Sequence, residues 1–115
     1  MTDDERFGLI HSLMVFSHTP DFSRWFRDKR VPASVLQSAG WVNGVPRLGV
    51  PDLRLTDAGL GITNPAGGRK GDSATALPSA QALAATFNPQ LAYESGAILG
   101  REARSRGFNV VLGAA

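Results

Sequence analysis

The fold is decided by residues 53–61, which read Leu53-Arg54-Leu55-Thr56-Asp57-Ala58-Gly59-Leu60-Gly61. Leu53 and Leu55 alternate with the polar residues Arg54 and Thr56, which predicts a short β-strand over 53–57. The small residues of 57–61 predict a tight turn where that strand ends. Asp57 therefore lies at the carboxyl end of a predicted strand, where open α/β sheets and (β/α) barrels place ligand-binding groups.

Asp57 has two interpretations that the sequence leaves open. Its carboxylate can accept two charge-assisted hydrogen bonds from the vicinal hydroxyls of a sugar. Alternatively, the same carboxylate caps the turn by accepting hydrogen bonds from the N–H groups of Gly59 or Leu60.

The second half of the chain predicts a strand–helix–strand unit. Residues 78–87 form a short alanine-rich helix, and an Asn-Pro pair then starts a longer helix over 88–106, which Gly107 ends. Residues 108–112 are apolar except for Asn109 and predict a buried strand. This order of elements predicts parallel pairing with the strand at 53–57. The residues on one face of the long helix are Leu91, Ser95, Ile98, Leu99 and Glu102.

The first half of the chain is less regular. Thr2 and Glu5 form a capping box, which predicts a helix that runs to about residue 16. Its predicted apolar stripe comprises Phe7, Ile10, Leu13 and Met14. Prolines and glycines interrupt residues 17–49, where we expect irregular structure with one helical turn over 32–38.

The composition is that of a globular domain. The chain has 115 residues, of which 43% are hydrophobic and 19% charged, and its net charge is +2. No apolar stretch is long enough to cross a membrane, and the acidic start is unlike a signal peptide. The absence of cysteine excludes disulfides and thiolate metal sites.

Two glycine-rich stretches fail as nucleotide-binding motifs. The third glycine of a dinucleotide fingerprint would fall at Asn64, and Lys70 within 67–71 is followed by glycine instead of Ser or Thr. His11 and His18 have no carboxylate at metal-ligand spacing, so we expect neither a metal nor a cofactor.

Basic and aromatic residues cluster in the irregular segment. The cluster comprises Phe22, Arg24, Trp25, Phe26, Arg27, Lys29 and Arg30. It permits a nucleic-acid site, but we favour a solvated loop over buried aromatic residues and expect no nucleic-acid partner.

The strand predicted at 108–112 lies close to the end of the sequence. Parallel strands are buried on both faces and need neighbours on each side, which two predicted strands cannot supply. We therefore expect further polypeptide to complete the sheet.

Several blocks of sequence together resemble family 3 glycoside hydrolases, in family order and at family spacing. They are Pro46-Arg47-Leu48-Gly49-Val50-Pro51, the stretch 55–61, Ala74-Thr75-Ala76-Leu77-Pro78, Ala84-Ala85-Thr86-Phe87-Asn88-Pro89, Gly100-Arg101-Glu102-Ala103-Arg104 and Gly107-Phe108-Asn109-Val110. Ala58 departs from the pattern, since many members have glycine there.

The resemblance implies the first strands and helices of a (β/α)8 barrel, completed by another chain or by a remainder. Residues 1–16 would be its opening helix, 17–49 an irregular segment and 50–115 its first βαβ region. We expect residues 17–38 to lie on the surface or at an interdomain contact.

The implied reaction is retaining hydrolysis of terminal, non-reducing β-glucosyl or related residues, with Asp57 binding the sugar in the −1 subsite. Retaining hydrolysis needs two carboxyl groups roughly 5–5.5 Å apart. In the family these lie in later parts of the protein, so we expect no catalytic residue in this chain and no activity from it alone. Glu94 and Glu102 lie in the long predicted helix, outside the barrel, and do not replace them.

The implied partners are a β-glucoside or oligosaccharide and the remaining C-terminal portion of the enzyme. The implied location is the periplasm or the extracellular space. The alternative is an α/β fragment that binds sugar without catalysis or is structural only.

Overall fold

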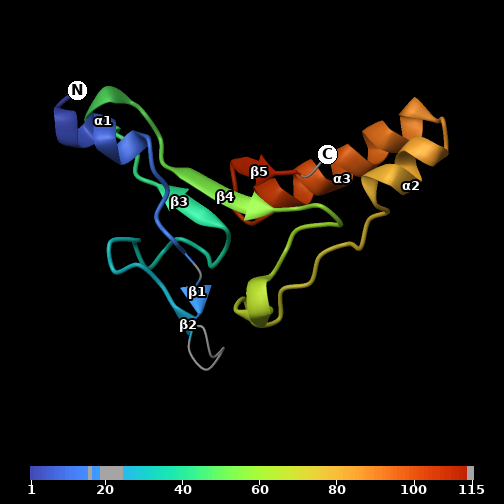
Figure 1. The fold of residues 1–115 in the computed structure, drawn as a ribbon, viewed down its shortest axis with the longest axis horizontal. Helices are drawn as coiled ribbons and strands as arrows, with labels where there is room; N and C mark the ends of the chain where they lie inside the picture. The colour runs from blue at the N-terminus through green and yellow to red at the C-terminus, as the bar shows by residue number, and fades with distance from the viewer. Residues whose placement is uncertain (16, 19–24, 114–115) are drawn as a thin grey trace.

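The computed structural model describes residues 1–15, 17–18 and 25–113, and arranges most of them around a three-stranded sheet (Figure 1). The strands of this sheet are β3 (Gly40–Val42), β4 (Leu53–Asp57) and β5 (Val110–Leu112). A two-stranded antiparallel ladder joins β1 (Ser17–His18) and β2 (Trp25–Phe26). The helices are α1 (Asp3–Leu9), α2 (Ala80–Ala85) and α3 (Pro89–Ser105), with 3-10 turns η1 (Pro46–Leu48) and η2 (Pro65–Gly67).

Strand β4 occupies the middle of the sheet, and its bounds match the predicted strand. It pairs in parallel with β5, with Asp57 opposite Leu112, so the predicted parallel pairing is confirmed. Strand β5 begins at Val110 instead of residue 108. Phe108 turns into the core and is 2% exposed. Asn109 still contacts β4, since its side-chain Oδ1 accepts a hydrogen bond of 2.7 Å from the N–H of Arg54.

Strand β3 pairs antiparallel with β4 and was not predicted. The α/β class is confirmed, but the sheet is mixed, and no closed barrel is formed by the described residues. Strand β4 has a neighbour on each side, of which β3 was not expected, whereas β5 pairs with β4 alone among the described residues. The expectation that further polypeptide completes the sheet beyond β5 stays a prediction.

Helix α1 has the predicted capping box, in which Thr2 and Glu5 exchange hydrogen bonds of 2.7 and 3.3 Å. The prediction that it reaches residue 16 was wrong. Leu13 exchanges two backbone hydrogen bonds with Trp41, of 2.7 and 3.0 Å, and groups engaged in this bridge cannot continue a helix. The predicted apolar stripe is therefore not buried as a unit, and Phe7 and Ile10 are exposed.

The described residues form two small cores. The first comprises Leu13, Val15, Val31, Val35 and Trp41. Three of these residues belong to the segment expected to be irregular, and the expectation that residues 17–38 lie on the surface was wrong for Val31 and Val35. The predicted helical turn at 32–38 is a single turn, closed by a 3.0 Å hydrogen bond from Val35 N–H to Pro32 O.

The second core packs the turn that follows β4 against the C-terminal end of α3 and comprises Ala58, Ile62, Ala103 and Phe108. Asn88 caps α3, as predicted, and Gly107 follows it with φ of +80°. Of the residues predicted to share one face of this helix, Leu91 is 44% exposed, whereas Leu99 packs against the core. Within the described residues, no helix is long and apolar enough to span a bilayer.

Candidate functional site

Asp57 ends β4 beside Leu112 of β5, and its side chain is exposed. Its backbone is fixed, because the carbonyl oxygen accepts a 2.9 Å hydrogen bond from the N–H of Thr63. Its carboxylate receives no hydrogen bond from the described residues, and the N–H groups of Gly59 and Leu60 do not cap it. The turn therefore holds its shape without this carboxylate, which is oriented by the strand and open to solvent.

A groove of about 500 Å³ follows Asp57 along the chain. One wall is residues 59–63 and the other is residues 74–76. The walls meet at Gly61, which has φ of +118° and where a Cβ would clash with the carbonyl oxygen of Thr75. A glycine is therefore required at this contact.

The loop that forms these walls is anchored by Arg69, whose side chain is 6% exposed. Its guanidinium donates hydrogen bonds to the carboxylate of Asp72 at 2.6 Å and to the carbonyl oxygens of Gln37 at 2.6 Å and Thr63 at 2.9 Å. The guanidinium also lies 5.3 Å from the ring centroid of Phe108 in the second core. Arg69 thus joins the loop to two separate parts of the fold.

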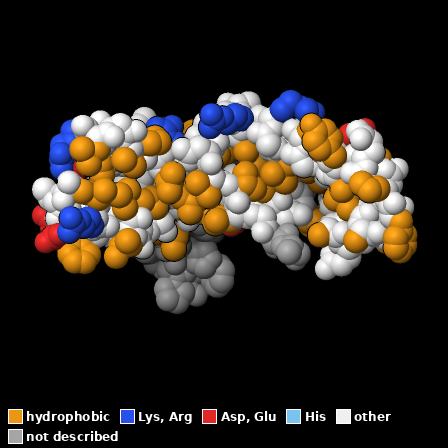
Figure 2. Space-filling view, turned by 90° about the horizontal axis from the view of Figure 1, so that it is seen from above, with side chains coloured by type: hydrophobic (Ala, Val, Ile, Leu, Met, Phe, Trp, Pro, Cys, Tyr) orange, Lys and Arg blue, Asp and Glu red, His pale blue; other side chains and the backbone are white. Residues whose placement is uncertain are grey.

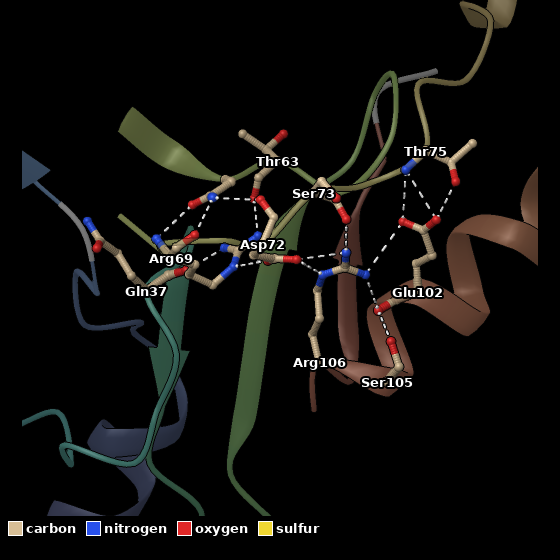
Figure 3. Close-up of polar contacts among 10 residues, drawn as sticks. Gln37, Thr63, Arg69, Asp72, Ser73, Thr75, Glu102, Ser105 and Arg106 are labelled. Carbon is tan, nitrogen blue, oxygen red and sulfur yellow. Dashed lines mark hydrogen bonds and ion pairs between the residues drawn. The ribbon is translucent and has the colours of Figure 1, made fainter. Parts of the chain in front are cut away.

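The network continues from Asp72 to α3 (Figure 3). Arg106 donates to Asp72 at 2.8 Å and to the carbonyl oxygen of Ser73 at 2.6 Å. Glu102 lies beside Arg106 and accepts hydrogen bonds from the N–H of Thr75 at 3.2 Å and from its hydroxyl at 2.5 Å. The network therefore holds the wall at 74–76 against the helix.

Both acids of this network are held in their ionised forms. Hydrogen bonds from Arg69, and then from Arg106, hold the pKa of Asp72 below its ordinary value of 3.8, against the opposing effect of burial. The hydrogen bond from the Thr75 hydroxyl lowers the pKa of Glu102 in the same way. The arrangement is a set of charge-assisted hydrogen bonds that stays intact at neutral pH.

The other acids and the histidines noted in the sequence lie elsewhere. Glu94 is exposed on α3, where it accepts a 3.0 Å hydrogen bond from Gln90. Glu102 supports the loop, as described, which fits its exclusion as a catalytic acid. His11 is exposed, with a ring nitrogen 2.6 Å from the carbonyl oxygen of Phe7, and the side chain of His18 lies outside the described residues. The part of the chain that the structure describes contains no cluster of three or more metal-ligating side chains.

The basic cluster is only partly described, because Phe22 and Arg24 lie outside the described residues. Arg30 pairs with Asp28 at 2.7 Å, and this contact lowers the pKa of Asp28 to about 2. Arg27 donates to the carbonyl oxygens of Val35 and Pro32. These two arginines therefore make local contacts within the segment.

The sequence did not reveal the role of Arg69, which lies in the glycine-rich stretch 67–71. Its partners come from three separate stretches of chain. The one local signal is the spacing of Arg69 and Asp72, three residues apart, which permits an ion pair across a turn.

The fold and the site together define an α/β protein with an exposed carboxylate at the carboxyl end of a parallel strand. Curated proteins that the chain resembles are named as β-glucosidases. The chain is 47% identical over 75 residues to "Probable beta-glucosidase F" of Emericella nidulans, a match that covers 65% of this chain and 8% of the relative. It is 41% identical over 76 residues to "Beta-glucosidase 2" of Saccharomycopsis fibuligera, covering 66% of this chain and 8% of that protein.

The resemblance to family 3 glycoside hydrolases of the β-glucosidase type is therefore confirmed. The chain spans less than a tenth of the length of these relatives. No protein-family model matches the chain. No solved structure matches it either.

Proposed function

We propose that this chain is part of a retaining β-glycoside hydrolase and that Asp57 binds the hydroxyl groups of the sugar in the −1 subsite. The observation that supports the proposal most directly is the carboxylate of Asp57, which is exposed at the end of β4 and has no hydrogen bond from the described residues. A pair of sugar hydroxyls would satisfy both of its oxygens with charge-assisted hydrogen bonds. The similarity to β-glucosidases supplies the class of substrate, a terminal β-glucosyl residue.

The proposal places the two catalytic carboxyl groups outside these 115 residues, in the remaining portion of the enzyme. Within the chain, Asp72 and Glu102 are engaged with arginines, and Glu94 lies on the exposed side of α3. The chain alone is then inactive, and the barrel that the resemblance implies is completed by that remaining portion. A periplasmic or extracellular location belongs to the same proposal and rests on the resemblance alone.

The test is the substitution Asp57→Ala in the complete enzyme that contains this chain. We expect kcat/KM for an aryl β-D-glucoside to fall at least about 30-fold, which corresponds to about 2 kcal/mol of lost transition-state stabilisation. The fall reflects hydrogen bonds that strengthen as the sugar ring flattens toward the transition state. Glu94→Gln, an exposed change on α3, is the control and should leave kcat/KM unchanged.

Two outcomes would contradict the proposal at different levels. Unchanged kinetics of Asp57→Ala would show that this residue does not bind the sugar in the −1 subsite. If the complete protein that contains the intact chain cleaves no β-glycoside, the hydrolase assignment is wrong. The alternative, a non-enzymatic sugar-binding or structural fragment, would then be favoured.

A further inference from the structure

The two walls of the groove beside Asp57 are attached to opposite ends of one ion network (Figure 3). Thr63 lines one wall, and its carbonyl oxygen accepts a 2.9 Å hydrogen bond from Arg69. Thr75 lines the other wall, and its N–H and hydroxyl donate to Glu102. The shape of the groove therefore depends on how these two ends are held relative to each other.

Asp72 is the group that joins the two ends. One of its carboxylate oxygens lies 2.6 Å from Nε of Arg69, and the other lies 2.8 Å from Nε of Arg106. The side chains of the two arginines are 6% and 14% exposed, so their attraction to this carboxylate is weakly screened by water. Loss of its charge would leave two nearby cations without their shared counter-ion.

The network also reaches the backbone of Asp57 through Thr63. Thr63 accepts from Arg69 through its carbonyl oxygen and donates through its N–H to the carbonyl oxygen of Asp57. A movement of Arg69 would consequently shift the end of β4 from which the Asp57 carboxylate projects.

We propose that Asp72 is a positioning residue, which fixes the spacing of the groove walls and the direction of the Asp57 carboxylate and so sets the fit of the sugar. This inference rests on the proposed function. It is separate from the sugar contact assigned to Asp57, because Asp72 acts through Arg69 and Arg106 and does not touch the sugar. The lowered pKa of Asp72 agrees with it, because the carboxylate is charged at the pH of an assay.

The first experiment measures kinetics of Asp72→Asn in the complete enzyme. Asparagine keeps the size of the side chain and removes its charge. We expect KM for an aryl β-D-glucoside to rise on the order of tenfold, with a smaller change in kcat, because a displaced binding group weakens sugar binding before it affects the catalytic acids. Asp72→Glu retains the charge and should restore part of the affinity, whereas Glu94→Gln should change nothing.

The second experiment needs no activity. Amide hydrogen exchange reports on the N–H groups of Thr63 and Thr75, which donate to Asp57 and Glu102. In Asp72→Asn both should exchange faster, while the N–H of Leu13 in the first core should not change. If Asp72→Asn does not fold, Glu102→Gln is measured in its place. This variant should speed hydrogen exchange at the N–H of Thr75 and leave the exchange rate of the Thr63 N–H unchanged.

The outcomes separate this inference from the proposed function. If Asp57→Ala loses activity but Asp72→Asn leaves both KM and the two exchange rates unchanged, Asp72 has no positioning role and the hydrolase assignment stands. If Asp57→Ala has no effect, the sugar-binding role of Asp57 fails, and the exchange rates alone decide whether Asp72 holds the walls together. Equal acceleration at Leu13 would reduce Asp72 to a general contributor to stability and overturn the inference.

Discussion

Gly61 shows how one residue limits the shape of the candidate site. It lies where the groove walls touch, and its backbone has a positive φ that residues with a Cβ adopt only at a cost in free energy. A Cβ on the nearby Gly59 would instead point into open space, with no atom within 4 Å, so the two glycines differ in what they tolerate.

This difference gives a matched pair of substitutions. Gly61→Ala should lower the free energy of unfolding by about 1–3 kcal/mol, because it adds both backbone strain and a clash with the carbonyl oxygen of Thr75. Gly59→Ala should change it by less than about 1 kcal/mol. Urea unfolding of the two variants measures both values, and an equal effect at the two positions would contradict the close contact.

At the scale of elements, the ion network joins the loop between β4 and α2 to the C-terminal end of α3. Asp72 and Glu102 face the guanidinium groups of Arg69 and Arg106, and each acid has a lowered pKa in the folded protein. An acid with a lowered folded pKa stabilises the fold above its unfolded pKa, and this stabilisation is lost as the pH falls through the folded value. The ordinary values are 3.8 for Asp72 and 4.5 for Glu102.

We therefore expect the contribution of the network to be complete at neutral pH and to be lost progressively below about pH 4.5. Comparison of Asp72→Asn with the unaltered chain isolates this contribution, because other acids titrate in both proteins. The difference in free energy of unfolding between them should shrink as the pH is lowered from about 7 to about 3. A difference that stays constant over this range would show that Asp72 is not held as a charged partner of the arginines.

The elements that the sequence predicted well are those with local signals. Strand β4 begins with leucines that alternate with polar residues, and α3 is marked at its ends by Asn88 and Gly107, so their positions follow from short stretches of chain. The end of α1 depends on the pairing of Leu13 with Trp41, and β3 depends on its pairing with β4, so both rest on contacts between separate stretches of chain. No local pattern specifies such a contact.

The residues of the candidate site likewise differ in whether local sequence predicts their positions. The position of Asp57 at the end of a strand could be predicted, because strand and turn are both local. The burial of Arg69 could not, since it results from contacts with Gln37, Thr63 and Phe108, contributed by separate segments.

At the scale of the whole molecule, the chain is more extended than a compact domain. Its radius of gyration is 16.1 Å, whereas a compact domain of this length has about 13 Å. Its accessible surface is 7608 Å², against about 6,100 Å² for a compact monomer of the same mass. Figure 2 shows apolar side chains spread along one face from end to end. The two cores are small for this surface, so the chain has apolar area that further polypeptide could cover.

Phe87 illustrates this exposure, since its side chain is 93% exposed and its φ is +50°, unusual for an aromatic residue. It lines an apolar groove of about 550 Å³ between α2 and α3. A residue held in this conformation with a large apolar side chain in water contributes little to the stability of the isolated chain, but could contribute to an interface.

This exposed apolar surface leads us to expect that the chain binds a second, larger polypeptide. Native mass spectrometry, compared with the masses of the denatured chains, tests this expectation. The complex should be weakened by Phe87→Asn, because asparagine removes the apolar ring, while the free energy of unfolding of the chain should not fall, since asparagine adopts a positive φ more readily. Glu94→Gln, on the exposed side of α3, should leave the complex intact. Recovery of the unaltered chain as a folded monomer with no companion would contradict the expected partner and, with it, the assembled hydrolase.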